Sequence, residues 1–228
     1  MLVNFLSHKT ISYAGCLTQM YFIYALGNTD SCLLAVMAFD RYVAICDPFH
    51  YVTTMSHCRC VLMVAFSCSL PHFHSLLHIL LLNHLTFCNS NVVQHFLCDI
   101  NPLLKLSCSS IFVNDLTIKT EGLVVLVTPF LCIVFSYVQI LVAVLRIPSA
   151  AGRHKAFSTC GSHLTVVILF YGSIFYVYLQ PLSSYTVRDR VATLVYTVLS
   201  SMLNPFIYSL RNKDMKRGLG KLMGRRKS

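Results

Sequence analysis

The sequence of 228 residues has the composition of a membrane protein, because 56% of its residues are hydrophobic and only 11% are charged. A water-soluble domain of this size would hardly stay in solution with so few charges. The formal net charge is +10, but the basic residues lie in short segments between apolar stretches. This pattern indicates cytoplasmic anchoring charge and does not favour a nucleic-acid-binding surface.

Five apolar stretches are long enough to cross a membrane as helices, which takes roughly 20 residues each. They cover residues 15–45, 61–82, 122–145, 156–179 and 191–210. A long polar loop, 83–115, separates the second stretch from the third. Pro129 and Pro205 lie inside two of the stretches and allow those helices to bend. We therefore predict an all-α, polytopic bundle of transmembrane helices.

The basic residues also predict the orientation of the chain. Most of them flank the same ends of the predicted helices and continue into the basic tail, 212–228. The positive-inside rule places these ends in the cytoplasm and Met1 outside. We expect a transmembrane unit, 1–211, followed by the cytoplasmic tail. Met215, Leu219 and Leu222 have the spacing of a short amphipathic helix on the inner leaflet, with a disordered basic tail as the alternative.

Asp40 and Arg41 end the first apolar stretch, in which Asp30 is the only earlier ionisable acid or base. A buried Arg is costly unless it is paired, and the adjacent Asp40 is the obvious partner. Asp30 lies ten residues earlier, about 15 Å deeper along a helix. A carboxyl group at that depth is a functional candidate, and a protonated, hydrogen-bonded Asp30 is the alternative.

Cys16, Cys88, Cys98 and Cys108 lie at or beyond the non-cytoplasmic ends of the predicted helices and are therefore disulfide candidates. The segment 95–99 fits an H-x-x-C-D/E metal-binding pattern. Because a disulfide-bonded Cys98 could not also be a thiolate ligand, we predict no metal site. No hydrolytic or redox constellation is visible, so we predict neither an enzyme nor a cofactor.

Several motifs resemble those of one receptor family. Residues 37–46, MAFDRYVAIC, resemble its MAYDRYVAIC signature, and residues 155–164, KAFSTCGSHL, match its KAFSTCxSHL motif. Ser136-Tyr137 and the NPxxY motif at 204–208 add to the resemblance. The chain is thereby identified as similar to the olfactory receptors, a branch of the rhodopsin-like G-protein-coupled receptors. On that alignment the third to seventh of the family's seven helices are present.

The resemblance implies an odorant receptor of the plasma membrane that binds small volatile ligands and activates a heterotrimeric G protein of the olfactory Gs type. It implies a ligand pocket that includes Ile23, Tyr24, Gly27, Asn28 and Tyr171. It assigns a cytoplasmic latch to Asp40, Arg41 and Tyr42. Further activation residues on the same basis are Tyr137, Arg153, Lys155, His163, Asn204, Pro205 and Tyr208.

The resemblance also implies the disulfide pairs Cys16–Cys98 and Cys88–Cys108. For the proposed site residues, ordinary helix packing, a helix-end salt bridge at Asp40-Arg41 and a hydrogen-bonded interior His163 remain alternatives. For the chain as a whole, the alternative is a truncated, non-signalling membrane polypeptide. A small transporter or channel is not favoured, because internal repeats and a charged pore lining are missing from the sequence.

Overall fold

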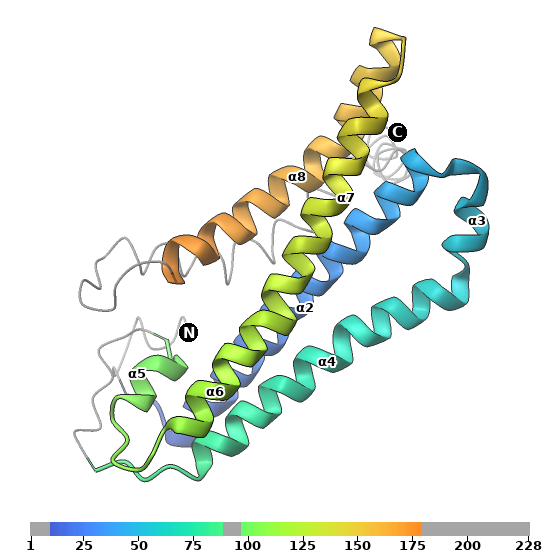
Figure 1. Ribbon diagram of the computed structural model, residues 1–228. Coiled ribbons are helices and arrows are strands. Elements are labelled where there is room, and N and C mark those ends of the chain that lie inside the picture. Colours follow the sequence, from blue (N-terminus) through green and yellow to red (C-terminus); the bar gives the residue numbers. More distant parts are fainter. Residues whose placement is uncertain (1–9, 89–96, 179–228) are drawn as a thin grey trace, which may run out of the picture. The chain divides into compact units, whose positions relative to one another are not determined.

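The computed structural model describes residues 10–88 and 97–178, and the regular structure of these residues is helical (Figure 1). This confirms the predicted all-α class. A single isolated bridge, between Phe87 and Ser107, is the exception among the described residues. The helices in chain order are α2 (Tyr13–Cys46), η1 (Pro48–His50), α3 (Tyr51–Thr54), α4 (His57–Asn83), α5 (Ile100–Leu104), α6 (Phe112–Glu121), η2 (Gly122–Val127), α7 (Thr128–Leu145) and α8 (Ala150–Tyr178).

The chain divides into two compact units, and the boundary lies within α7, after Ile140. In the first unit α2 packs along α4, and α6 and η2 complete the contact (Figure 1). The α2 helix begins at the N-cap Ser12, whose side chain accepts a hydrogen bond from the Gly15 amide. In the second unit α8 is the principal described helix.

Three described helices are long and apolar enough to cross a membrane: Tyr13–Cys46, His57–Asn83 and the continuous run Phe112–Leu145. The first matches the predicted stretch 15–45 closely, and the second begins four residues before the predicted 61–82. In α8 the apolar part, Cys160–Tyr176, is shorter. The fifth predicted stretch, 191–210, and the tail, 212–228, lie outside the described residues. The predicted total of five helices therefore stays a prediction.

The third membrane helix begins at Phe112, ten residues before the predicted start. The extra turns contain charged side chains that the sequence pattern had assigned in part to a loop. Lys119 Nζ lies 2.6 Å from Asp115 Oδ2, at i,i+4 spacing, which supports a helix. Glu121 lies buried in the first unit. The expected loop, 83–115, was therefore drawn too long.

A π-helical turn, η2, joins α6 to α7 just before Pro129. The amide of Thr128 donates to the Leu123 carbonyl, five residues back, and its hydroxyl donates to the same oxygen at 2.9 Å. Pro129 has no amide hydrogen to continue the α-helical ladder. A π-turn is one of the ways in which a helix accommodates such a break, and it lies directly before Pro129, where a bend was expected.

A hydrophobic cluster of the first unit lies where the long loop covers the end of α2. The buried side chains of this cluster are Cys16, Met20, Leu82, Cys98, Ile100, Leu103 and Leu104. Short helix α5 therefore lies against α2 and α4 and closes this end of the unit. We call it the disulfide end, and the opposite end of α2 the Asp40 end.

Candidate functional site

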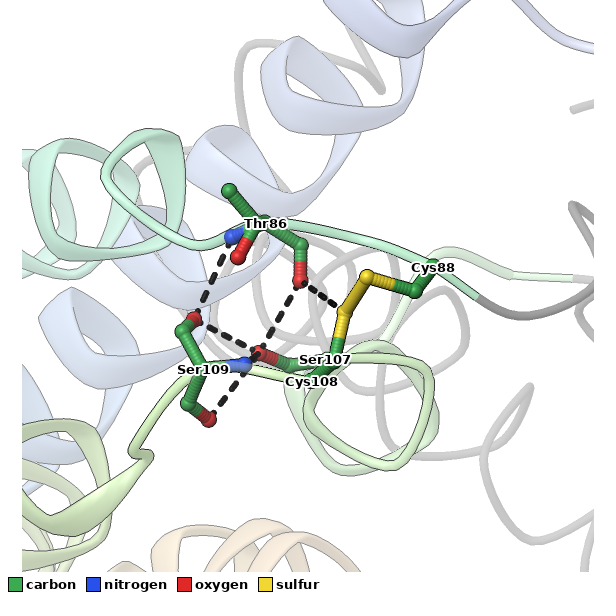
Figure 2. The surroundings of a disulfide bond; sticks show 5 residues. All are labelled: Thr86, Cys88, Ser107, Cys108 and Ser109. Carbon is green, nitrogen blue, oxygen red and sulfur yellow. Dashed lines mark hydrogen bonds between the residues drawn. A yellow bond between two sulfur atoms is a disulfide. The ribbon is translucent and has the colours of Figure 1, made fainter.

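Two disulfides fix the loop at the disulfide end, and they are the pairs that the resemblance implied. Cys16 of α2 is bonded to Cys98, and Cys88 is bonded to Cys108 within the loop. Around the second bridge, the Thr86 carbonyl accepts from the Cys108 amide at 3.0 Å. Ser107 and Ser109 add side-chain hydrogen bonds (Figure 2). The loop is thus held at defined points over the helices.

Tyr24 and Asn28 of α2, both candidate ligand residues, make polar contacts across the first unit. The Tyr24 hydroxyl donates to Asp99 of the loop, and Asn28 Nδ2 donates to Glu121 Oε1 at 2.8 Å. The two residues are four apart and so share one face of the helix. Ile23 and Gly27, the neighbouring candidates, are half-buried on the same helix.

A buried pair, His78 and Glu121, extends this group of polar residues. His78 Nε2 and Glu121 Oε2 are in contact, and the two residues are only 2% and 7% exposed. The Tyr24 ring lies 6.3 Å from the His78 ring, centroid to centroid. The sequence did not assign a role to either residue, because they are 43 positions apart. For His78, its position inside the apolar span 61–82 was the available signal, whereas Glu121 falls just before the predicted span 122–145.

Tyr171, the remaining candidate ligand residue, lies on α8 in the second unit. It is buried and packs its ring against Phe170 and Phe175, with centroid distances of 5.2 and 6.1 Å. Its relation to Tyr24 and Asn28 stays a prediction.

At the Asp40 end, the carboxylate of Asp40 binds a residue that the sequence did not single out. Tyr51 of α3 donates its hydroxyl proton to Asp40 Oδ1 at 2.8 Å. The ion pairs formed among residues 10–88 and 97–178 do not include Asp40 with Arg41. The expected pairing of these two neighbours is therefore not observed, and Asp40 is bonded to Tyr51 instead. Arg41 and Tyr42 are half-buried.

The contact with Asp40 changes the acidity of the Tyr51 phenol. The hydrogen bond to the carboxylate, then burial, then the charge of Asp40 raise the pKa of Tyr51 above its usual value of about 10. The phenol is therefore protonated at physiological pH and available as a donor. The short helices after Pro48 bring Tyr51 back towards α2.

The other expected activation residues lie in the two units, and some of them are outside the described residues. Tyr137 is half-buried on α7, Arg153 is half-buried on α8, and His163 is buried on α8. Lys155 lies in α8 with its side chain outside the described set. Asn204, Pro205 and Tyr208 lie outside the described residues.

The described residues contain no group of three or more His, Cys, Asp or Glu side chains arranged for a metal ion. Cys98 of the metal-binding pattern is in a disulfide with Cys16 and therefore has no thiolate to offer. His95 of that pattern lies outside the described residues.

Comparison with known proteins gives one consistent answer. A family model described as olfactory receptor matches residues 1–226. Olfactory receptor 1L8 of Homo sapiens is 77% identical over 99% of this chain and 74% of that receptor. Human olfactory receptors 1L1 and 1L3 are 71% and 70% identical over 100% of this chain, which covers 63% and 71% of their lengths. The chain is thus shorter than these relatives.

The membrane-length helices, the disulfide-anchored loop and these matches define a multi-pass membrane receptor. The chain belongs to the olfactory receptor family, whose members bind odorants and couple to G proteins. Membership confirms the odorant-receptor class inferred from the motifs, and it confirms that the chain is not an enzyme.

Proposed function

We propose that this chain binds a small volatile odorant near the disulfide end of α2 and activates a heterotrimeric G protein at the Asp40 end. The observation that supports it is that one unbroken helix, α2, carries candidate residues for both tasks. Asn28 and Asp40 are twelve residues apart, about 18 Å along a helix. A rigid helix that shifts at one end also shifts at the other, which provides a route for coupling.

The ligand end combines apolar helix faces with few polar groups, a composition that suits a small, largely apolar ligand. Tyr24 and Asn28 supply polar atoms on the half-buried face of α2, and Ile23 and Gly27 lie beside them. Tyr171, on α8 of the second unit, is a further proposed ligand residue on the basis of the resemblance alone.

The G-protein end contains Arg41 and Tyr42, and the Asp40–Tyr51 bond holds the neighbouring carboxylate. The ion pairs of the described residues do not include Arg41, so its guanidinium is available to a partner. The remaining proposed coupling residues, carried over from the family motifs, are Tyr137, Arg153, Lys155, His163, Asn204, Pro205 and Tyr208. The expected partner is a Gs-type α subunit.

The proposed membrane arrangement follows from the basic residues. The transmembrane unit, 1–211, crosses the plasma membrane several times, and the basic tail, 212–228, lies in the cytoplasm. In this orientation the disulfide end faces outward, where oxidising conditions allow Cys16–Cys98 and Cys88–Cys108 to form. The Asp40 end then faces the G protein.

The test is odorant-evoked cAMP in cells that display the epitope-tagged chain at the surface, measured over a chemically broad panel. Wild type is expected to respond to at least one ligand, with Arg41→Ala silent and Val52→Ala responsive at equal surface density. Val52 is an exposed side chain of the short α3 helix, so it controls for nonspecific damage. A surface-displayed wild type that is silent to the whole panel would favour the non-signalling polypeptide.

A further inference from the structure

A buried polar cluster joins three helices near the disulfide end, and helix packing alone does not require it. Its members are Asn28 of α2, His78 of α4 and Glu121 of α6, with Tyr24 and Asp99 adjoining. We call these five residues the Glu121 cluster. Burying a carboxyl group and an imidazole is costly unless both are well paired. Polar residues at membrane depth are candidates for function by default.

The hydrogen bonds of the cluster determine what a ligand could add. Two donors converge on Glu121, since Asn28 donates to one carboxylate oxygen and His78 Nε2 contacts the other. This arrangement suits an ionised carboxylate that accepts from both. With its proton on Nε2, the neutral His78 ring presents a lone pair at Nδ1. That atom is buried and has no hydrogen-bond partner in the structure.

The unused capacity of the cluster is therefore for hydrogen-bond donors. His78 Nδ1 accepts, and each carboxylate oxygen of Glu121 has a second lone pair. Asp99 is a further carboxylate, already accepting from Tyr24 and from the Ile100 amide. A ligand that offers only acceptor atoms would meet lone pairs and negative charge.

Charge distinguishes between the kinds of donor. Residues 13–40, 60–83 and 120–145, which include most of the three membrane helices, contain no Lys or Arg. The basic residue nearest to Glu121 in sequence is Lys119, whose side chain is 69% exposed and paired with Asp115. Glu121 and Asp99 therefore create a negative potential that these spans do not neutralise, and a cation gains more from it than a neutral hydroxyl does.

We propose that the Glu121 cluster anchors the protonated amino group of an amine ligand, with His78 Nδ1 as the acceptor, the Glu121 carboxylate supplying negative charge from the opposite side of the His78 ring, and Tyr24 alongside. This rests on the proposed function and specifies its ligand class. A primary ammonium has three donors and fits the acceptor-rich site. An alcohol of the same skeleton is a weaker ligand, and carboxylic acids and aldehydes are disfavoured.

The first experiment uses the wild-type chain and needs no substitution. Cells with confirmed surface display are exposed to linear, branched and cyclic skeletons, each offered as a primary amine, an alcohol, an aldehyde and a carboxylic acid. The expected order of cAMP potency is amine, then alcohol, with aldehyde and acid weakest. A response confined to aldehydes or acids overturns the inference but leaves the proposed function standing. Silence to all four classes rejects both.

The second experiment removes the charge with little change in shape. Glu121→Gln is expected to raise the EC50 of the active amine about 10- to 100-fold, because it removes a buried negative charge that lies behind the His78 ring. The EC50 of the matching alcohol should change several-fold at most. Asp115→Asn removes an exposed carboxylate from the same helix and should leave both values unchanged. Equal losses for amine and alcohol would identify a structural cluster only and overturn the inference.

The wild-type comparison keeps the proposal falsifiable if Glu121→Gln does not reach the surface. In that case the order of amine, alcohol, aldehyde and acid on the unmodified chain alone supports or overturns the assignment.

Discussion

Tyr51 shows how one hydroxyl group can set the state of the charged pair at the Asp40 end. Its bond to Asp40 Oδ1 competes with Arg41 for that carboxylate. The sequence placed Asp40 and Arg41 at a helix end but paired them with each other, because they are adjacent. Tyr51 lies eleven residues after Asp40, and the pattern of apolar residues does not predict the turn that returns it to α2.

Tyr51→Phe is therefore expected to lower signalling. Losing the hydroxyl frees Asp40 to pair with Arg41 and disfavours the coupling-competent state by about 1 kcal/mol, roughly fivefold in the equilibrium. Basal and ligand-evoked cAMP at matched surface density measure the effect, with Val52→Ala as the control. Unchanged or raised signalling would argue against this role for the bond.

The same hydrogen bond should depend on pH in the alkaline range. Because the folded-state pKa of Tyr51 lies above the unfolded value of about 10, its stabilising contribution is complete below that value. The contribution is lost as pH rises through the folded pKa. The difference in melting temperature between wild type and Tyr51→Phe, in detergent, should persist at neutral pH and vanish in strong alkali. A difference that grows with pH would contradict the assignment.

At the scale of the element, the length of the apolar stretches predicted the three membrane-length helices of the described residues. Charged residues near the start of the third helix led to a predicted start that was too late. Helix α2 was predicted within two residues, because the apolar stretch 15–45 covers nearly the whole helix. The third membrane helix was predicted to start ten residues late, because Asp115, Lys119 and Glu121 resemble a loop in sequence. Their charges are met by an i,i+4 pair and by partners on α2 and α4, which only the tertiary structure supplies.

In the candidate site, too, some residues were predicted from the sequence and others were found only in the structure. Tyr24 and Asn28 were predicted from the family resemblance, while His78 and Glu121 were not. Their significance lies in a contact across 43 residues, which periodicity does not encode.

The π-turn before Pro129 should determine where Glu121 lies. Pro129→Ala restores an amide donor and favours regular α-helix. Removing the extra residue of the turn would rotate α6 by roughly 100° relative to α7 and withdraw Glu121 from Asn28 and His78. We expect at least about a tenfold loss of ligand potency at normal surface density. Unchanged potency would show that the turn does not position the cluster.

The two disulfides should contribute unequally to stability. The bridge Cys16–Cys98 spans 82 residues and Cys88–Cys108 spans 20. Loop-closure entropy gives about 4.5 and about 3.3 kcal/mol respectively. The double variant Cys16→Ser/Cys98→Ser should therefore melt at a lower temperature than Cys88→Ser/Cys108→Ser, and it also loses a buried contact between loop and α2. The reverse order would contradict this account.

For the whole molecule, the proposal is that ligand binding at the disulfide end is coupled through α2 to the Asp40 end. Family membership is established by similarity over nearly the full chain, whereas the coupling through α2 is a proposal for this chain. Asn28 and Asp40 lie about 18 Å apart on the same helix. The coupling therefore depends on whether a shift of α2 at the ligand end also moves its Asp40 end.

The most direct test is nucleotide exchange on a purified Gs heterotrimer by the chain reconstituted in lipid discs. The measurement compares the exchange rate with and without the most potent ligand from the cell panel, for wild type and for Arg41→Ala. The account predicts ligand-stimulated exchange by wild type and none by Arg41→Ala, although both bind the ligand. Ligand binding by wild type without stimulated exchange would contradict it.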